Sequence, residues 1–120
     1  NENRIKAASL YNQLILDKKL PVTIPKVIEN ADHVYQMYTV TVDSKLRNKV
    51  VTDLNQLGVE ASVHFDPPVH KQEYYKDFEI RVSLENTELL SNSIVTLPMF
   101  SSITFEEISY VVECLEKVLK

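Results

Sequence analysis

The strongest constraint on the fold is an amphipathic pattern that runs from Thr104 to the C-terminus. Thr104 and Glu107 have the spacing of a capping box, in which each side chain bonds the free backbone N–H of the other residue. Ile103 and Ile108 stand where two apolar side chains close the start of a helix. The apolar residues of this segment share one broad helical stripe: Ile108, Val111, Val112, Leu115, Val118 and Leu119. A helix with such a stripe must bury it against a second layer.

Three segments have the patterns of strands. The clearest is Val59–Phe65, where apolar and polar residues alternate, so that one face enters the core and the other points outward. Val34–Val42 is predicted to be a second strand, and Ile94–Leu97 a short third strand that ends at Pro98. The run Phe78–Val82 also alternates and is compatible with an added strand. In Val59–Phe65 the residues expected in the core are Val59, Ala61, Val63 and Phe65, and those expected outside are Glu60, Ser62 and His64.

Helices are predicted before and between these strands. Residues 3–17 repeat apolar side chains at helical spacing. A second helix is expected to begin at Asp43 or Ser44, and Gly58 follows it where a left-handed residue is favoured. Shorter helical turns are expected at 72–76 and 86–92. The buried stripe of the second helix is predicted to contain Leu46, Val50, Leu54 and Leu57.

The order of elements predicts an α/β (α+β) two-layer sandwich. Its sheet is expected to be small, mostly antiparallel and three- to four-stranded, with helices on one face. The other face, which contains His64, then meets either water or another body. A length of 120 residues fits one domain.

Composition excludes several classes of function. The net charge is −4 and the basic residues are scattered, which argues against nucleic-acid binding. The single glycine cannot form a glycine-rich phosphate loop. The single cysteine, Cys114, excludes an internal disulfide and a thiolate metal cage, and favours a cytoplasmic setting. No apolar run is long enough for a membrane helix.

The segment most suited to ligand contact is Val63–Tyr75, a double-proline loop with two histidines and two tyrosines. His64 is predicted to point away from the core at the end of a strand, either as an ordinary surface residue or as a ligand contact. The spacing of His33, His64 and His70 matches no usual zinc site. Cys114 is expected to be a buried thiol rather than a nucleophile. The residues alone therefore indicate a soluble α/β domain with one loop that presents side chains.

Four motifs, taken in order, resemble the C-terminal small domain of the DegT/DnrJ/EryC1/StrS sugar aminotransferases. The first, Arg4-x-x-x-Ala8-x-x-Tyr11-x-x-Leu14, resembles the helix that joins the two domains of those enzymes. The second is the strand His33–Val42, and the third runs from Gly58-Val59 through Val63-His64-Phe65-x-Pro67-Pro68-Val69-His70 to Tyr74-Tyr75. The fourth is Leu97-Pro98-Met99-Phe100 with Thr104-x-Glu106-Glu107-Ile108-x-Tyr110-Val111.

The resemblance implies roles that the residues alone do not supply. It implies that His64, Phe65 and His70 contact a nucleotide-linked keto sugar. Two departures from the family pattern matter, because Phe65 replaces a more usual tyrosine and Gln36 stands where a second histidine is common. The resemblance also implies a domain division, with residues 1–20 as the interdomain helix and residues 26–120 as the sandwich.

The resemblance further implies that the full-length parent is a pyridoxal-phosphate-dependent transaminase of amino-sugar biosynthesis. Its cofactor lysine is expected on the large domain, its amino donor is glutamate or glutamine, and the parent is expected to be a homodimer. We therefore expect no catalytic, cofactor or metal residue in this chain, and no activity from the chain alone. The alternative is a stand-alone, non-catalytic α/β domain for binding or oligomerisation.

Overall fold

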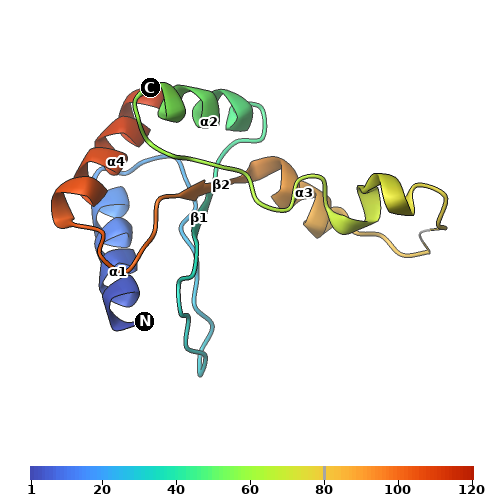
Figure 1. Ribbon diagram of the computed structural model, residues 1–120, viewed down its shortest axis with the longest axis horizontal. Coiled ribbons are helices and arrows are strands. Elements are labelled where there is room, and N and C mark those ends of the chain that lie inside the picture. The colour runs from blue at the N-terminus through green and yellow to red at the C-terminus, as the bar shows by residue number, and fades with distance from the viewer. Residues whose placement is uncertain (80) are drawn as a thin grey trace.

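The computed structural model describes residues 1–79 and 81–120 (Figure 1). Two strands lie at the centre of the molecule, and the helices at the two ends of the chain, blue and red in Figure 1, lie on one side of them. In chain order the elements are α1 (Glu2–Asp17), β1 (Tyr38–Thr41), α2 (Arg47–Gln56), the 3₁₀ turns η1 (Val69–Lys71) and η2 (Glu73–Tyr75), α3 (Glu85–Ser93), β2 (Ile94–Leu97) and α4 (Phe105–Val118).

The sheet consists of β1 and β2, paired antiparallel with Tyr38 opposite Leu97 and Val40 opposite Val95. A single bridge extends it on each side, from Thr23 to Thr41 and from Ser62 to Thr96. The predicted α/β class and the antiparallel sheet are confirmed, but the described residues form two strands rather than three or four. The flanking segments each contribute only one bridge, so they do not become full strands.

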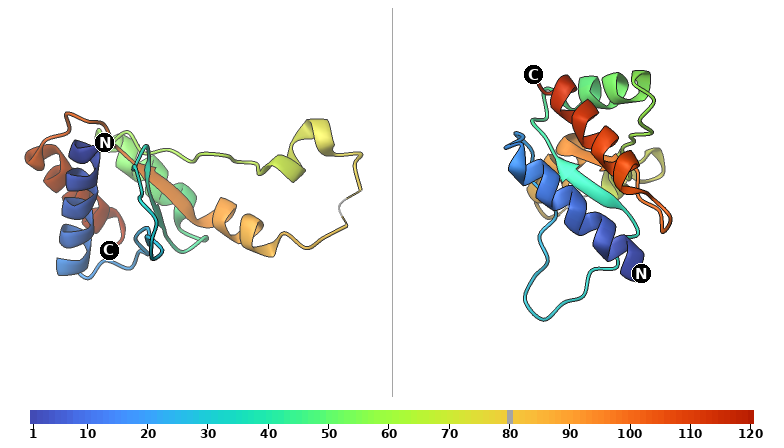
Figure 2. Two further views of the ribbon diagram at one scale, coloured as in Figure 1. Left: turned by 90° about the horizontal axis from the view of Figure 1, so that it is seen from below. Right: turned by 90° about the vertical axis from the view of Figure 1, so that its left-hand side faces the viewer.

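The core lies between the sheet and two helices, α1 and α4, which cover one face of it (Figure 2). Alternation along the strands directs Tyr38, Val40, Val95 and Leu97 toward these helices, and all four are fully buried. Tyr11 of α1 stacks on Tyr38 with ring centroids 4.5 Å apart, and its hydroxyl donates to the Pro98 carbonyl at 2.7 Å. These contacts attach α1 to the sheet.

The C-terminal helix forms as its sequence predicts. The Thr104 hydroxyl accepts a hydrogen bond from the Glu107 N–H at 3.1 Å, and the Glu107 carboxylate accepts one from the Thr104 N–H at 2.7 Å. Gly58 has a φ of +81°, the left-handed conformation predicted for it after α2. The predicted apolar stripe of α4 is buried at Ile108, Val111, Val112 and Leu115, and partly buried at Val118 and Leu119.

Three sequence predictions differ from the structure. The strand predicted over Val34–Val42 is shorter and covers Tyr38–Thr41, because Tyr35 adopts a left-handed φ of +49° that interrupts it. The buried side of α2 contains Arg47, Val50 and Leu54, whereas Leu46 and Leu57, which were predicted to be buried, are exposed. The first buried position is therefore Arg47 instead of Leu46, which places a charged side chain inside the domain.

The strand predicted over Val59–Phe65 is also shorter than expected. Val59 and Ala61 are buried as predicted, but Phe65 is 75% exposed and has a left-handed φ of +58°. The chain therefore leaves the sheet after Ser62, and Phe65 cannot belong to the core.

Residues 63–79 and 81–93 belong to a projection, here called the arm, which extends to one side of the sheet and contains η1, η2 and α3 (Figures 1 and 2). The arm explains why the radius of gyration is 15.6 Å, when a compact domain of this length has about 13.6 Å. Part of the possible strand Phe78–Val82 lies outside the described residues, and the described residues of that run are not in a strand. The arm returns to the sheet through α3, which leads directly into β2.

Candidate functional site

His64 lies on the face of the sheet opposite α1 and α4, here called the open face. The Nδ1 atom of His64 is 3.0 Å from the Thr96 hydroxyl oxygen and 3.4 Å from that of Ser62. The Thr96 hydroxyl is in turn 3.2 Å from that of Thr39. Strand alternation explains this grouping, because Thr39 and Thr96 are opposite one another in the register and point away from the core.

The hydroxyl contacts of His64 occupy only one of its ring nitrogens. Among the described residues, no hydrogen-bond partner is found for His64 Nε2. A threonine hydroxyl can donate or accept, so Nδ1 can take either role and Nε2 can present either a donor or an acceptor. The sheet therefore orients the imidazole and leaves one polar atom available to a ligand.

A cavity of about 290 Å³ lies beside His64 on the open face. Besides His64, its polar lining consists of Gln36, Glu60, Ser62 and Thr96, and its apolar lining consists of Met37, Leu97 and Met99. A site for a small molecule usually spans about 300 to 1,000 Å³ and combines an apolar wall with a few polar groups. This cavity has that composition, and its volume lies just below that range.

Phe65 is next to His64 but does not belong to the sheet. The centroids of the two rings are 6.3 Å apart, and the rings are tilted by 56°. The left-handed backbone of Phe65 places its ring in solvent beside the imidazole. A flat apolar ring in this position is available to stack on a ligand that His64 contacts.

His70 lies in the arm, away from the cavity that contains His64. Its Nε2 atom is 3.0 Å from a carboxylate oxygen of Glu88 in α3, and the Lys71 ammonium is 3.4 Å from the same oxygen. The hydrogen bond from His70, together with that from Lys71, holds the pKa of Glu88 below its ordinary value. His70 lines a different cavity, together with Val69, Tyr75, Leu84 and Thr87. The structure thus brings His64 and Phe65 together and places His70 in separate surroundings.

Arg47 is a charged residue inside the domain, with an exposed fraction of 5%. Its Nη1 atom donates to the Ser91 carbonyl at 2.6 Å, and its Nε atom donates to the Asn48 side chain at 2.8 Å. Its Nη2 atom is 3.5 Å from a carboxylate oxygen of Asp66, which follows Phe65 in the chain. Arg47 therefore contacts the arm where it begins and where it ends.

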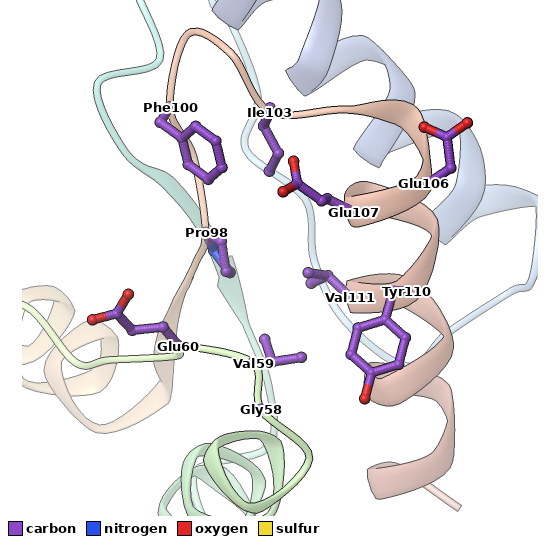
Figure 3. A pocket seen from close by; sticks show the side chains of 10 residues that line it. All are labelled: Gly58, Val59, Glu60, Pro98, Phe100, Ile103, Glu106, Glu107, Tyr110 and Val111. Atoms are coloured by element: carbon purple, nitrogen blue, oxygen red, sulfur yellow. The ribbon is translucent and has the colours of Figure 1, made fainter.

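A larger cavity of about 400 Å³ lies between the segment after α2 and the first turns of α4 (Figure 3). Its wall is mainly apolar, with Pro98, Phe100 and Ile103 on one side. Its polar side chains are carboxylates and Tyr110, whose hydroxyl already donates to the Leu57 carbonyl at 2.7 Å. The lining contains no histidine or basic residue, so the smaller cavity beside His64 is better suited to polar ligand recognition.

The residues of this chain do not fit a pyridoxal-phosphate site. Such a site needs a lysine for the Schiff base and a carboxylate for the pyridine nitrogen. Every lysine of the chain is exposed, and the cavity that Lys6 lines, with Asn3 and Ser101, has no carboxylate in its lining. In the described part of the chain, no cluster of three potential metal ligands is found. None of the helices over residues 1–79 and 81–120 has the length and apolar character needed to span a lipid bilayer.

Sequence reasoning missed Thr39, Thr96 and Arg47. Thr39 and Thr96 interrupt apolar strand segments with a hydroxyl, which was a weak signal for a polar open face. Arg47 precedes Val50 by three positions and Leu54 by seven, so its place on the buried side of the helix was visible in the spacing. The bridge between Ser62 and Thr96 joins residues distant in sequence and left no local signal.

Comparison with known proteins gives consistent matches. The profile of the DegT/DnrJ/EryC1/StrS aminotransferase family matches residues 1–116. A dTDP-3-amino-3,6-dideoxy-alpha-D-galactopyranose transaminase of Aneurinibacillus thermoaerophilus is 26% identical over 117 residues, covering 98% of this chain and 31% of that protein. The chain thus spans less than a third of the length of this relative.

Solved structures show the same fold. NtdA of Bacillus subtilis, with bound cofactor PMP, superposes with a TM-score of 0.83 at 28% identity, covering 98% of this chain and 28% of that one. DesV of S. venezuelae, in complex with a ketimine intermediate, superposes with a TM-score of 0.87 at 21% identity, covering 100% of this chain and 32% of that one.

Proposed function

Because the chain belongs to the DegT/DnrJ/EryC1/StrS aminotransferase family, we propose that it is the small C-terminal lobe of a nucleotide-sugar aminotransferase. In this proposal the open face closes one side of the active site and contacts the sugar nucleotide. The observation that carries it is the oriented imidazole of His64, whose Nδ1 contacts Thr96 at 3.0 Å beside a cavity of suitable composition.

The proposed substrate contacts follow from the chemistry of the side chains. His64 Nε2 hydrogen-bonds a sugar hydroxyl or a phosphate oxygen, and Phe65 stacks on an apolar face of the substrate. His70 is proposed as a third contact. Its Nε2 is already bonded to Glu88, so Nδ1 is the ring nitrogen proposed to meet the ligand. The dTDP-sugar transaminase among the relatives supports a nucleotide-linked sugar as the substrate class.

The remaining machinery is proposed to lie on the rest of a longer polypeptide. Pyridoxal phosphate there supplies the electron sink for transamination, with glutamate or glutamine as amino donor. Residues 1–20 are proposed to connect that large domain to the sandwich formed by residues 26–120. We further propose a cytoplasmic, homodimeric parent.

The alternative is a stand-alone domain for binding or oligomerisation without catalysis. The arm favours it, because Tyr74 and Phe78 are exposed there and stack with ring centroids 6.2 Å apart. The aminotransferase reading accounts for more of the molecule, since it also explains the oriented His64 and the cavity beside it.

The test is His64→Ala in the full-length enzyme that carries this chain. Losing one hydrogen bond worth about 1.4 kcal/mol corresponds to about a tenfold rise in the KM of the nucleotide sugar. The KM of the amino donor should stay the same, because that substrate does not meet the open face in this proposal. His64→Gln is the matched control, since its amide nitrogen reaches toward the position of Nε2 and should restore part of the loss. Equal effects of His64→Ala on both KM values refute the assignment.

A further inference from the structure

The arm begins and ends at the same buried side chain, that of Arg47. We infer that Arg47, acting through Asp66, is a positioning residue that holds the His64–Phe65 turn in place for substrate. This inference rests on the proposed function of His64 and Phe65. Neither Arg47 nor Asp66 is assigned a contact with substrate.

The contacts of the guanidinium define this role. Arg47 Nη1 donates to the Ser91 carbonyl at 2.6 Å and lies 3.4 Å from the Ile94 carbonyl, where α3 passes into β2. Arg47 Nη2 is 3.5 Å from Asp66, where the chain has just left the sheet. One side chain from α2 therefore joins the outgoing and returning segments of the arm. A planar guanidinium with several donors suits this task, and a lysine ammonium does not.

Electrostatics explains why a charge is tolerated inside the domain. A buried cation needs nearby negative groups to offset its loss of hydration. The C-terminal carbonyls of α3 carry the partial negative charge of the helix dipole, and the last turn of α3 has no basic residue of its own. Among the contacts found for the guanidinium in the described residues, Asp66 supplies the one full negative charge.

The turn before Asp66 needs such an anchor. Phe65 has a φ of +58°, a backbone conformation that is unfavourable for a residue other than glycine unless surrounding contacts hold it. Asp66 provides two of these contacts, because its second carboxylate oxygen lies 3.5 Å from the Ser91 hydroxyl. Both distances are long and the Asp66 side chain is 43% exposed, so the anchor is weak enough for a single substitution to loosen it.

The test uses Asp66→Asn in the full-length enzyme, with Asp77→Asn as the matched control on an exposed aspartate of the same arm. We expect Asp66→Asn to raise the KM of the nucleotide sugar about three- to tenfold, because a contact displaced by a fraction of an ångström loses much of its strength. The KM of the amino donor and the behaviour of Asp77→Asn should match the wild type. Hydrogen exchange of the backbone over residues 62–67 should accelerate in Asp66→Asn only.

Arg47→Lys is the second substitution in this experiment. If Arg47 acts through Asp66, the double variant should raise the KM of the sugar by less than the product of the two single effects. The inference is overturned if the effect of the double variant on the KM of the sugar equals the product of the two single effects. It is also overturned if Asp66→Asn changes neither that KM nor the hydrogen exchange over residues 62–67. If His64→Ala leaves the KM of the sugar unaltered while Asp66→Asn still accelerates exchange over residues 62–67, the anchoring role stands and the proposed substrate contact of His64 fails.

Discussion

Removing the Thr96 hydroxyl tests whether the orientation of His64 matters for substrate binding, because the histidine itself stays in place. Thr96 is 6% exposed, and valine has nearly the same shape, so Thr96→Val removes little besides the hydroxyl. Two contacts are lost, one to His64 Nδ1 at 3.0 Å and one to the Thr39 hydroxyl at 3.2 Å. Each is worth about 0.5–1.5 kcal/mol net. Since Thr39 and His64 are only partly buried, water replaces some of the loss.

We therefore expect Thr96→Val to lower the free energy of unfolding by about 1–2 kcal/mol. The freed imidazole should also raise the KM of the nucleotide sugar in the full-length enzyme about three- to tenfold. Urea denaturation measures the first effect and steady-state kinetics the second. Thr96→Ser keeps the hydroxyl and should retain most of the substrate affinity.

Thr41→Val is the matched control for the open face, because Thr41 lies in β1 opposite Ile94 and no side-chain hydrogen bond is found for it among the described residues. It should leave stability within about 0.5 kcal/mol of the wild type. If Thr96→Val and Thr41→Val behave alike, or if Thr96→Ser is as impaired as Thr96→Val, the hydroxyl does not orient His64.

Two further predictions concern pH. Burial, with a smaller contribution from neighbouring groups, raises the pKa values of Tyr11 and Tyr38 above the ordinary 10.0. The stability that the neutral phenols contribute is therefore complete below pH 10.0 and is lost as the pH rises above it. The urea concentration at the unfolding midpoint should fall over this range, and it should fall less steeply in Tyr11→Phe. A midpoint independent of pH in this range would contradict the burial of these hydroxyls. The pKa of Glu88 is lowered chiefly by its hydrogen bond from His70. The ionised Glu88 therefore stabilises the arm fully above the ordinary pKa of 4.5, and this stabilisation is lost as the pH falls through the pKa of Glu88 in the folded protein. Hydrogen exchange in the arm should accelerate on acidification, and Glu88→Gln should weaken that dependence; an unchanged dependence in the variant would count against this ion pair.

Local signals in the sequence were sufficient for some elements. The capping box of Thr104 and Glu107 and the position of Gly58 depend on residues within a few positions of each other, and both form as predicted. Alternation was less reliable in Val59–Phe65, because it predicts the core face only while the chain stays extended and does not show where the segment leaves the sheet. Only the bridge at Ser62 forms, and the chain then turns away.

The candidate site was only partly predictable for a related reason. His64 was recognised as lying off the core, but its partner Thr96 is 32 positions away in sequence and comes near it only through the sheet. Arg47 was not predicted on the buried side of α2, because Leu46, one position earlier, offered a more hydrophobic residue for the buried stripe. The contacts of Arg47 with both ends of the arm outweigh that preference.

Hydrogen–deuterium exchange of the full-length enzyme, with and without a dTDP-linked sugar, tests most directly whether the open face meets the substrate. The amides of His64 and Phe65 have no backbone hydrogen bond among the described residues, so they should exchange rapidly in the free enzyme. Binding of the sugar nucleotide should slow exchange over residues 62–66, and an amino donor alone should not. Unchanged exchange over these residues at saturating sugar nucleotide would contradict the account.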